Sequence, residues 1–256
     1  MYYYVFEQPK NKREAGLQNR IIAELEAENI LGEAVIANPI QKPKELVEIG
    51  LEKGFRTIVL AGSDSFVNNL APIIAEKKRV VGIIPLARES SFWNLIGCYH
   101  WREIIKALPQ RRTENFDLVR LGQEKFFLTF VKIEDQKQFV AFLEFPDFKI
   151  VVPAKTIIFT NGGFGQEGFV GNYFLLKDGK LQVLISGPKD EKRGGIFSFF
   201  KKSEKVFSTK IPTPWLKIKT ERPEKILAPD GTAIGQTPAG LAVEKNAVRI
   251  IVKRRV

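Results

Sequence analysis

The alternation of strand and helix patterns over the first hundred residues constrains the fold more than any other feature of this chain. Short β-branched and aromatic runs alternate there with stretches whose apolar residues recur every three or four positions. One run, TIVLA at residues 57–61, is continuously apolar, as is typical of a strand buried on both faces of its sheet. Regular alternation predicts an α/β domain over residues 1–108, with a parallel sheet flanked by helices. The expected strands are 2–6, 33–37, 57–61 and 80–86, with helices between them and one more from Trp101.

The hydrophobic period changes near Arg111, and from there the chain alternates at the period of strands. This predicts an all-β domain over residues 109–256, an antiparallel sandwich or barrel, whose last strand could also return to the first domain. The expected strands are 126–133, 138–145, 149–152, 155–160, 171–176, 181–186, 206–211, 216–220 and 247–253, with turns at 134–137 and 146–147.

The charge is uneven along the chain. The net charge is +11, of which residues 1–128 carry +2 and residues 129–256 carry +9. A basic excess favours anionic partners, which here means nucleotide phosphates, an acidic membrane surface or nucleic acid; a solubilising surface also accounts for it. Cys98 and His100 are the only residues of their types, which excludes an internal disulfide and a zinc site of several Cys or His ligands. With no signal-peptide pattern and no apolar run of spanning length, we expect a cytoplasmic protein.

The turn after the third predicted strand is a candidate phosphate site. It reads Ala61-Gly62-Ser63-Asp64-Ser65 and opens a helix. Small residues expose backbone N–H groups, and a helix N-terminus attracts phosphate. Asp64 could orient a metal ion or a ribose. Alternatively, the same residues simply cap the helix.

Two further turns have comparable features. Residues 85–97 (PLARESSFWNLIG) also follow a predicted strand. Residues 230–232 (DGT) form a third turn, which on its own is typical of a β-hairpin.

Taken in chain order, these segments resemble the lipid kinases of the diacylglycerol kinase and sphingosine kinase superfamily. The family pattern G-G-D-G-T-x-N-E stands here as residues 62–69 (GSDSFVNN), and P-x-G-T-x-N-D-F-A-x-x-L-G falls on residues 85–97. The family's N-x-x-x-G-G and D-G-x-L resemble residues 160–164 and 177–181, and its D-G-E followed by G-x-x-P resembles residues 230–238. The resemblance covers nearly the whole chain.

This resemblance implies a nucleotide-binding α/β domain followed by a β-sandwich, and ATP-dependent phosphorylation of a lipid hydroxyl of diacylglycerol or sphingoid type. It implies that Asp230 is the general base and that Asp64 lies near Mg²⁺ and ATP. The residues that match nucleotide-binding positions are Gly62, Ser63, Asp64, Ser65, Asn68, Ala87, Arg88, Ser90 and Ser91.

Several motif positions depart from the family together. Ser63 and Ser65 replace glycines that let a backbone approach phosphates closely, and Phe66 replaces a hydroxyl. Ser91 and Thr232 replace an aspartate and a glutamate that could neutralise or orient a metal. We therefore expect phosphorylation to be reduced or lost. The alternative is a non-catalytic nucleotide- or lipid-binding pseudokinase, and a lesser alternative is a nucleic-acid-binding protein that uses the basic β-domain.

Residues 194–202 (GGIFSFFKK) combine aromatic and basic side chains, which suits an anionic bilayer interface. Ordinary core packing of the aromatic rings explains the pattern equally well. The expected membrane contacts are Phe197, Phe199, Phe200, Lys201 and Lys202. We therefore expect a lipid substrate or an anionic membrane surface at the inner face as partner, and a homodimer through edge strands is also open.

Overall fold

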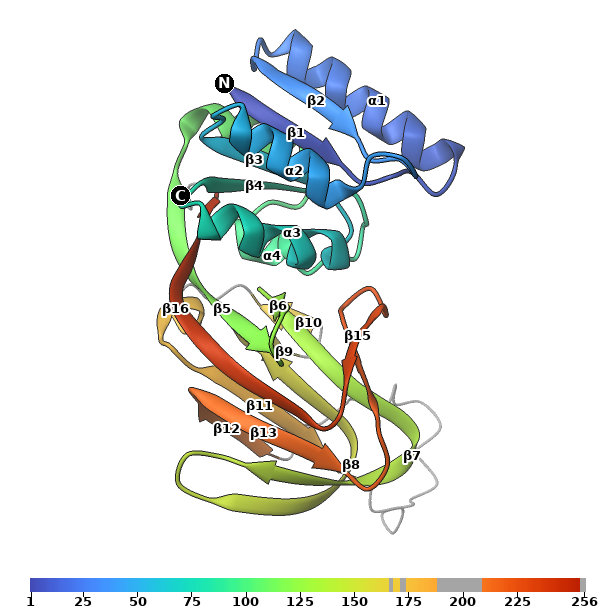
Figure 1. Ribbon diagram of the computed structural model, residues 1–256, viewed down its shortest axis with the longest axis vertical. Helices are drawn as coiled ribbons and strands as arrows, with labels where there is room; N and C mark the ends of the chain where they lie inside the picture. Colours follow the sequence, from blue (N-terminus) through green and yellow to red (C-terminus); the bar gives the residue numbers. More distant parts are fainter. Residues whose placement is uncertain (166–167, 171–173, 188–208, 254–256) are drawn as a thin grey trace, which may run out of the picture.

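Four parallel strands form the N-terminal part of the fold, in the order β2-β1-β3-β4 (Figure 1). The computed structural model describes residues 1–165, 168–170, 174–187 and 209–253. The strands are β1 (Tyr2–Phe6), β2 (Gly32–Ile36), β3 (Thr57–Gly62) and β4 (Val80–Pro85), and the helices are α1 (Lys12–Ala27), α2 (Pro43–Glu52), α3 (Asp64–Glu76), α4 (Phe92–Ile96) and α5 (Trp101–Ala107). Helix α1 packs with α5 and α2 with α3, which confirms the predicted parallel sheet with flanking helices.

The second part is an antiparallel β-domain, as the change of period predicted. Its central strands run in the order β12-β11-β8-β7-β13-β16. The strands are β5 (Thr113–Leu121), β6 (Lys125–Phe127), β7 (Phe130–Glu144), β8 (Lys149–Thr160), β9 (Gly163–Gly165), β10 (Gly168–Val170), β11 (Leu181–Ser186), β12 (Thr209–Thr213), β13 (Trp215–Thr220), β14 (Lys225–Leu227), β15 (Ala233–Gln236) and β16 (Ala239–Ile251).

Strand β16 belongs to both parts of the molecule. Its first half pairs with β13, and its second half lies parallel to β4, with Arg249 opposite Val80. Strand β5 runs antiparallel beside it over nearly its whole length. Figure 1 shows β16 in red, rising from the β-domain to the helical part. The two strands thus connect the two parts as continuous backbone.

Two apolar cores lie on either side of this connection. The first fills the α/β part and includes Phe116, Val248 and Ile250 from the connecting strands. The second lies inside the β-domain and includes Val119 and Leu241 from the same two strands. Each connecting strand therefore contributes side chains to both cores.

The structure corrects two sequence-based predictions in the β-domain. The predicted turn at 134–137 is wrong, because β7 continues through it with a register shift between Glu134 and Phe139. A bulge accommodates its polar residues, and Asp135 pairs there with Arg222. The strand predicted at 171–176 is wrong for the described residues, because Leu175–Lys177 forms a 3₁₀ turn.

The structure also differs from the sequence-based expectation at β5 and β12. Strand β5, whose sequence TENFDLVRL is largely polar, was not predicted. The predicted strand at 206–211 begins outside the described residues, where β12 is described from Thr209. Within the described residues, no helix is long and apolar enough to cross a membrane.

Candidate active site

A cavity of about 570 Å³ lies between the two parts of the molecule. Ser90 and Ser91 line it from the turn that follows β4, and Phe130 and Phe169 line it from the β-domain. Pro229 also lines it, and its neighbour Asp230 is hydrogen-bonded to Ser65 at the start of α3. The structure therefore brings the three predicted turns to one region, at the carboxyl ends of the parallel strands, where ligands of open α/β sheets bind.

The turn from β3 into α3 is tightly packed. A Cβ at Gly62 would lie 2.5 Å from the Phe66 ring and 2.9 Å from a Glu7 carboxylate oxygen, so only glycine fits. The Ser63 side chain caps α3 by accepting the Phe66 N–H at 3.3 Å. The Ser63 backbone N–H and hydroxyl both donate to the Glu7 carboxylate, at 2.6 and 3.0 Å. The N–H group that would face a phosphate is thus already bound to a carboxylate.

Asp230 reaches the same helix terminus from the other part of the molecule. Its carboxylate accepts the Ser65 backbone N–H at 3.0 Å and the Ser65 hydroxyl at 2.8 Å. It also accepts the Thr232 N–H at 3.1 Å within its own turn. Asp230 therefore fastens the β14–β15 turn to the start of α3.

Asp64 is buried, with 2% of its surface exposed. Its carboxylate accepts the Ser91 N–H at 3.0 Å and the hydroxyls of Ser90 and Ser91. The Ser91 hydroxyl also contacts the Thr129 hydroxyl at 2.7 Å. The serine that replaces the family's aspartate thus binds Asp64 and does not add a second charge.

The pKa values of Asp64 and Asp230 are shifted in opposite directions. Burial raises the pKa of Asp64, the hydrogen bonds from Ser90 and Ser91 oppose this, and repulsion from Asp230 adds to it. Burial also acts to raise the pKa of Asp230, but the hydrogen bonds from Ser65 and Thr232 outweigh it and leave that pKa below its usual value.

The remaining predicted residues have mixed surroundings. Asn68 is buried and its carbonyl oxygen accepts the Leu128 N–H at 3.0 Å, so it connects α3 to the β-domain. The Ala87 carbonyl accepts the Trp93 indole N–H at 2.9 Å, which shapes the second turn. Arg88 is exposed and lines the cleft.

A second cavity of about 520 Å³ adjoins the cleft, with Arg88 and Trp93 lining both. It lies against α1 and the turn after β4, and Arg13 and Arg20 line it as well. Three arginines against one glutamate, Glu14, give this second cavity a net positive charge.

The residues of the α3 terminus do not fit the phosphates of ATP with Mg²⁺. Two of its backbone N–H groups already donate to Glu7 and Asp230. Asp64 is surrounded by its serine donors, and no group of three or more His, Cys, Asp or Glu side chains within the described residues could hold a metal ion. A phosphate there would also approach the carboxylates of Glu7, Asp64 and Asp230.

Glu7 is the functional residue that the sequence reasoning missed. It directly follows β1, which pairs parallel with β3, and the Glu7 N–H donates to the Ala61 carbonyl at 2.8 Å. Its place directly after the first predicted strand could have identified it, because the carboxyl ends of neighbouring parallel strands lie at the same sheet edge.

The two remaining family-like motifs, residues 160–164 and 177–181, form hydrogen bonds with other segments of the β-domain. The Asn161 amide donates to the carbonyls of Asp117 and Leu128, at 2.7 and 3.2 Å. The buried Asp117 carboxylate accepts the N–H groups of Gly179 and Asn246, at 2.7 and 2.8 Å. These motifs have a structural role here. The expected membrane contacts (Phe197, Phe199, Phe200, Lys201 and Lys202) lie outside the described residues.

The overall fold of this chain matches that of three solved structures over nearly its whole length. It is similar to solved structures of a diacylglycerol kinase and two putative diacylglycerol kinases, all from Bacillus anthracis str. Sterne, with TM-scores of 0.73, 0.72 and 0.75. The identities are 16%, 13% and 15%, and each alignment covers 98% of this chain and 97% of the other. No family model matches the chain, and no curated protein matches it by sequence. The resemblance expected from the ordered motifs is confirmed at the level of fold.

Proposed function

We propose that this protein is a pseudokinase, a lipid-kinase fold that no longer transfers phosphate from ATP. One observation carries the proposal: the backbone N–H groups of Ser63 and Ser65 are bound by the protein's own carboxylates, Glu7 and Asp230. Phosphoryl transfer depends on such donors and on metal ions to neutralise the phosphates. Here a nucleotide would have to displace both carboxylates and approach their charge.

The direct test is calorimetry of the full chain with Mg-ATP, together with a phosphate-transfer assay on diacylglycerol and on a sphingoid base in mixed micelles. We expect neither binding heat nor product. Robust turnover that Asp230→Asn abolishes would refute the proposal.

A variant pair tests whether Glu7 closes the site. Glu7→Ala removes one carboxylate and frees the Ser63 N–H, so we expect measurable Mg-ATP binding where the wild type has none. Glu48→Ala removes an exposed glutamate on α2 and is the matched control, which should bind no better than the wild type. Equal heats for both variants would show that Glu7 is not what excludes the nucleotide.

Lipid phosphorylation remains the second candidate. The observation that favours it is the position of Asp230 next to Pro229 of the cleft lining, because a carboxylate there could accept a proton from a lipid hydroxyl. The transfer assay separates the two candidates.

A further inference from the structure

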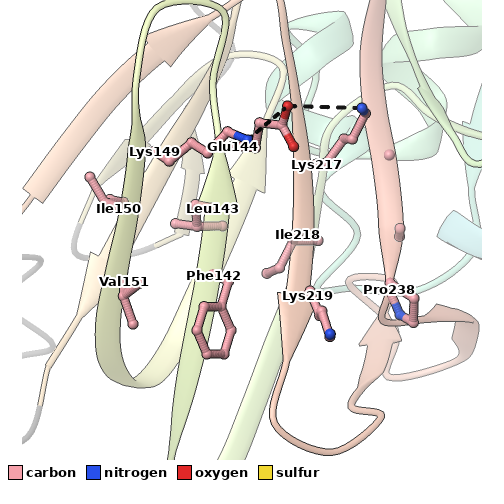
Figure 2. Close-up of a pocket in the computed structure, with 12 residues that line it drawn as sticks. Phe142, Leu143, Glu144, Lys149, Ile150, Val151, Lys217, Ile218, Lys219 and Pro238 are labelled. Atoms are coloured by element: carbon pink, nitrogen blue, oxygen red, sulfur yellow. Dashed lines mark ion pairs between the residues drawn. The ribbon is translucent and has the colours of Figure 1, made fainter.

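A second hollow lies on the outward face of the β-domain, and it shares no lining residue with the cleft (Figure 2). Its volume is about 600 Å³, within the usual range of small-molecule sites. Strands β7, β8 and β13 and the start of β16 form its floor. We call this hollow the sheet groove.

Strand register gives the groove an apolar row. Phe142 of β7 lies opposite Val151 of β8 on one side and opposite Lys219 of β13 on the other. The neighbouring residues Leu143 and Ile218 point into the core, with 1% of each exposed. Because side chains alternate along a strand, the row of Phe142 faces outward. Phe142 and Val151 are 41% and 63% exposed, an apolar surface that nothing in the described chain covers.

A second outward row is charged. Glu144 lies opposite Lys149 and Lys217, at 3.6 and 4.0 Å from their ammonium groups (Figure 2). Within the described residues, Lys219 of the first row forms no ion pair. Three lysines against one glutamate give the groove a net positive charge beside its apolar row.

Gly240 leaves the hollow open at its β16 side. It lies opposite Lys217 in register, and a Cβ built on it would meet no atom within 4 Å. A larger side chain there would therefore occupy the groove without disturbing the packing beneath it.

We propose that the sheet groove binds a monoacyl phospholipid with a phosphate-monoester head, such as a lysophosphatidate. The acyl chain packs on Phe142 and Val151, and the phosphate lies at Lys219 and Lys217. Charge complementarity selects this occupant. A second copy docked face to face would set lysines against lysines, and nucleic acid would leave the apolar row without a partner. The inference rests on the groove alone and does not depend on the proposed function.

Calorimetry with oleoyl-lysophosphatidate below its micelle concentration, without nucleotide, tests the proposal. Two comparison ligands separate the parts: glycerol 3-phosphate has the head without the chain, and monooleoylglycerol has the chain without the phosphate. We expect binding at least tenfold tighter for the complete lipid than for either part. Equal affinity for monooleoylglycerol would overturn the role of the lysines.

Two variants locate the site. Gly240→Phe fills the hollow and should weaken binding at least tenfold, as should Lys219→Gln, which removes one ammonium group from the lining. Lys180→Gln is the matched control, since Lys180 is an exposed lysine of the β-domain outside the groove. Circular dichroism checks that every variant is folded. Unchanged affinity in both groove variants would overturn the site.

Sedimentation addresses the other occupants. We expect the wild type and Gly240→Phe to have the same oligomeric state. A dimer that this substitution dissociates would show that the groove is an interface between copies of the chain. Binding to anionic vesicles without binding to the monomeric lipid would show a membrane-docking face, and either outcome overturns the proposal.

Discussion

Asp64 is the first residue of α3 and Asp230 binds the next residue, Ser65, yet their surroundings shift the two pKa values in opposite directions. Asp64 is enclosed by Ser90 and Ser91, and burial dominates its pKa. Asp230 is less enclosed and receives a backbone N–H and a hydroxyl from Ser65. Each carboxylate accepts hydrogen bonds from three donor groups, so the deeper burial of Asp64 explains why its pKa is raised while that of Asp230 is lowered.

We expect the unfolding free energy of the wild type, relative to Asp64→Asn, to fall as the pH rises. The pKa of Asp64 is raised in the folded state, mainly by burial, above the value of about 3.9 in an unfolded chain. The folded state therefore holds this proton more tightly, and the resulting stabilisation is complete below about pH 4 and is lost as the pH rises through the folded pKa. Urea denaturation of both proteins at a series of pH values measures it. Parallel curves would contradict the raised pKa.

For Asp230 the sign is reversed. Burial acts to raise its pKa, but the hydrogen bonds from Ser65 and Thr232 lower it overall, so the ionised form is favoured on folding. The stabilisation of the folded state by Asp230 is therefore present above the unfolded pKa of about 3.9 and is lost as the pH falls through the folded pKa. We expect Asp230→Asn to remove this acid-dependent loss. The same denaturation series measures it, and a variant that loses stability in acid as steeply as the wild type would contradict it.

At the scale of elements, the turn from β3 into α3 combines a packing constraint with a charge constraint. Gly62 provides room for the Phe66 ring, and Ser63 binds Glu7. Phe66 thus occupies space that a smaller residue would leave open beside the turn. The hydrogen bonds that stabilise the helix terminus also occupy the N–H groups of Ser63 and Ser65.

We expect Gly62→Ala to lower the unfolding free energy by about 1–3 kcal/mol, because the added methyl group overlaps the Phe66 ring. In Gly62→Ala with Phe66→Ala, the combined loss should be smaller than the sum of the two single losses, since the overlap is gone. Chemical denaturation of the four proteins in this double-mutant cycle measures the coupling. Additive losses would show that the ring is not the obstacle.

The elements that the sequence predicts well are those whose own residues show a clear apolar pattern. Strand β3 is buried along its whole length and its apolar run marked it clearly. Strand β7 was divided in two because residues such as Asp135 are typical of turns, whereas a bulge and the Arg222 ion pair accommodate them in a strand. The sequence does not predict strand β5, because this largely polar segment is stabilised by its pairing with β16, which lies far along the chain.

The same limit applied to the site. The motif order singled out Asp64 and Asp230, and in the structure Asp64 binds Ser91 while Asp230 binds Ser65, the neighbour of Asp64. Glu7 has no motif, and only the parallel pairing of β1 with β3 places it beside Ser63. What the sequence could not provide was the set of hydrogen bonds that fills the helix terminus.

For the whole molecule, the two connecting strands make the α/β part and the β-domain energetically dependent on each other. Phe116 is fully buried in the first core, while Val119 of the same strand belongs to the second. The neighbouring Asp117 accepts N–H groups from two distant segments, at Gly179 and Asn246. A disturbance in β5 therefore reaches both cores.

We expect Phe116→Ala to cost about 3–5 kcal/mol, the usual range for a buried phenylalanine, and the protein to keep a single unfolding transition. Amide hydrogen exchange should show the loss of protection in both β3 and β7. Phe142→Ala, an exposed phenylalanine of the β-domain, is the control and should leave both strands protected. Loss confined to one part would show that the two unfold independently.

The position of β16 has a consequence for how the chain is made. The neighbour of β4 in the parallel sheet is the last strand in the sequence, so the entire β-domain is synthesised between the two partners. A nascent chain leaving the ribosome therefore has one open edge on β4 until β16 has been synthesised. Such an edge can pair with other strands, and long-range pairing is slow to form. The period in which this edge is exposed to misassembly therefore ends with the synthesis of β16.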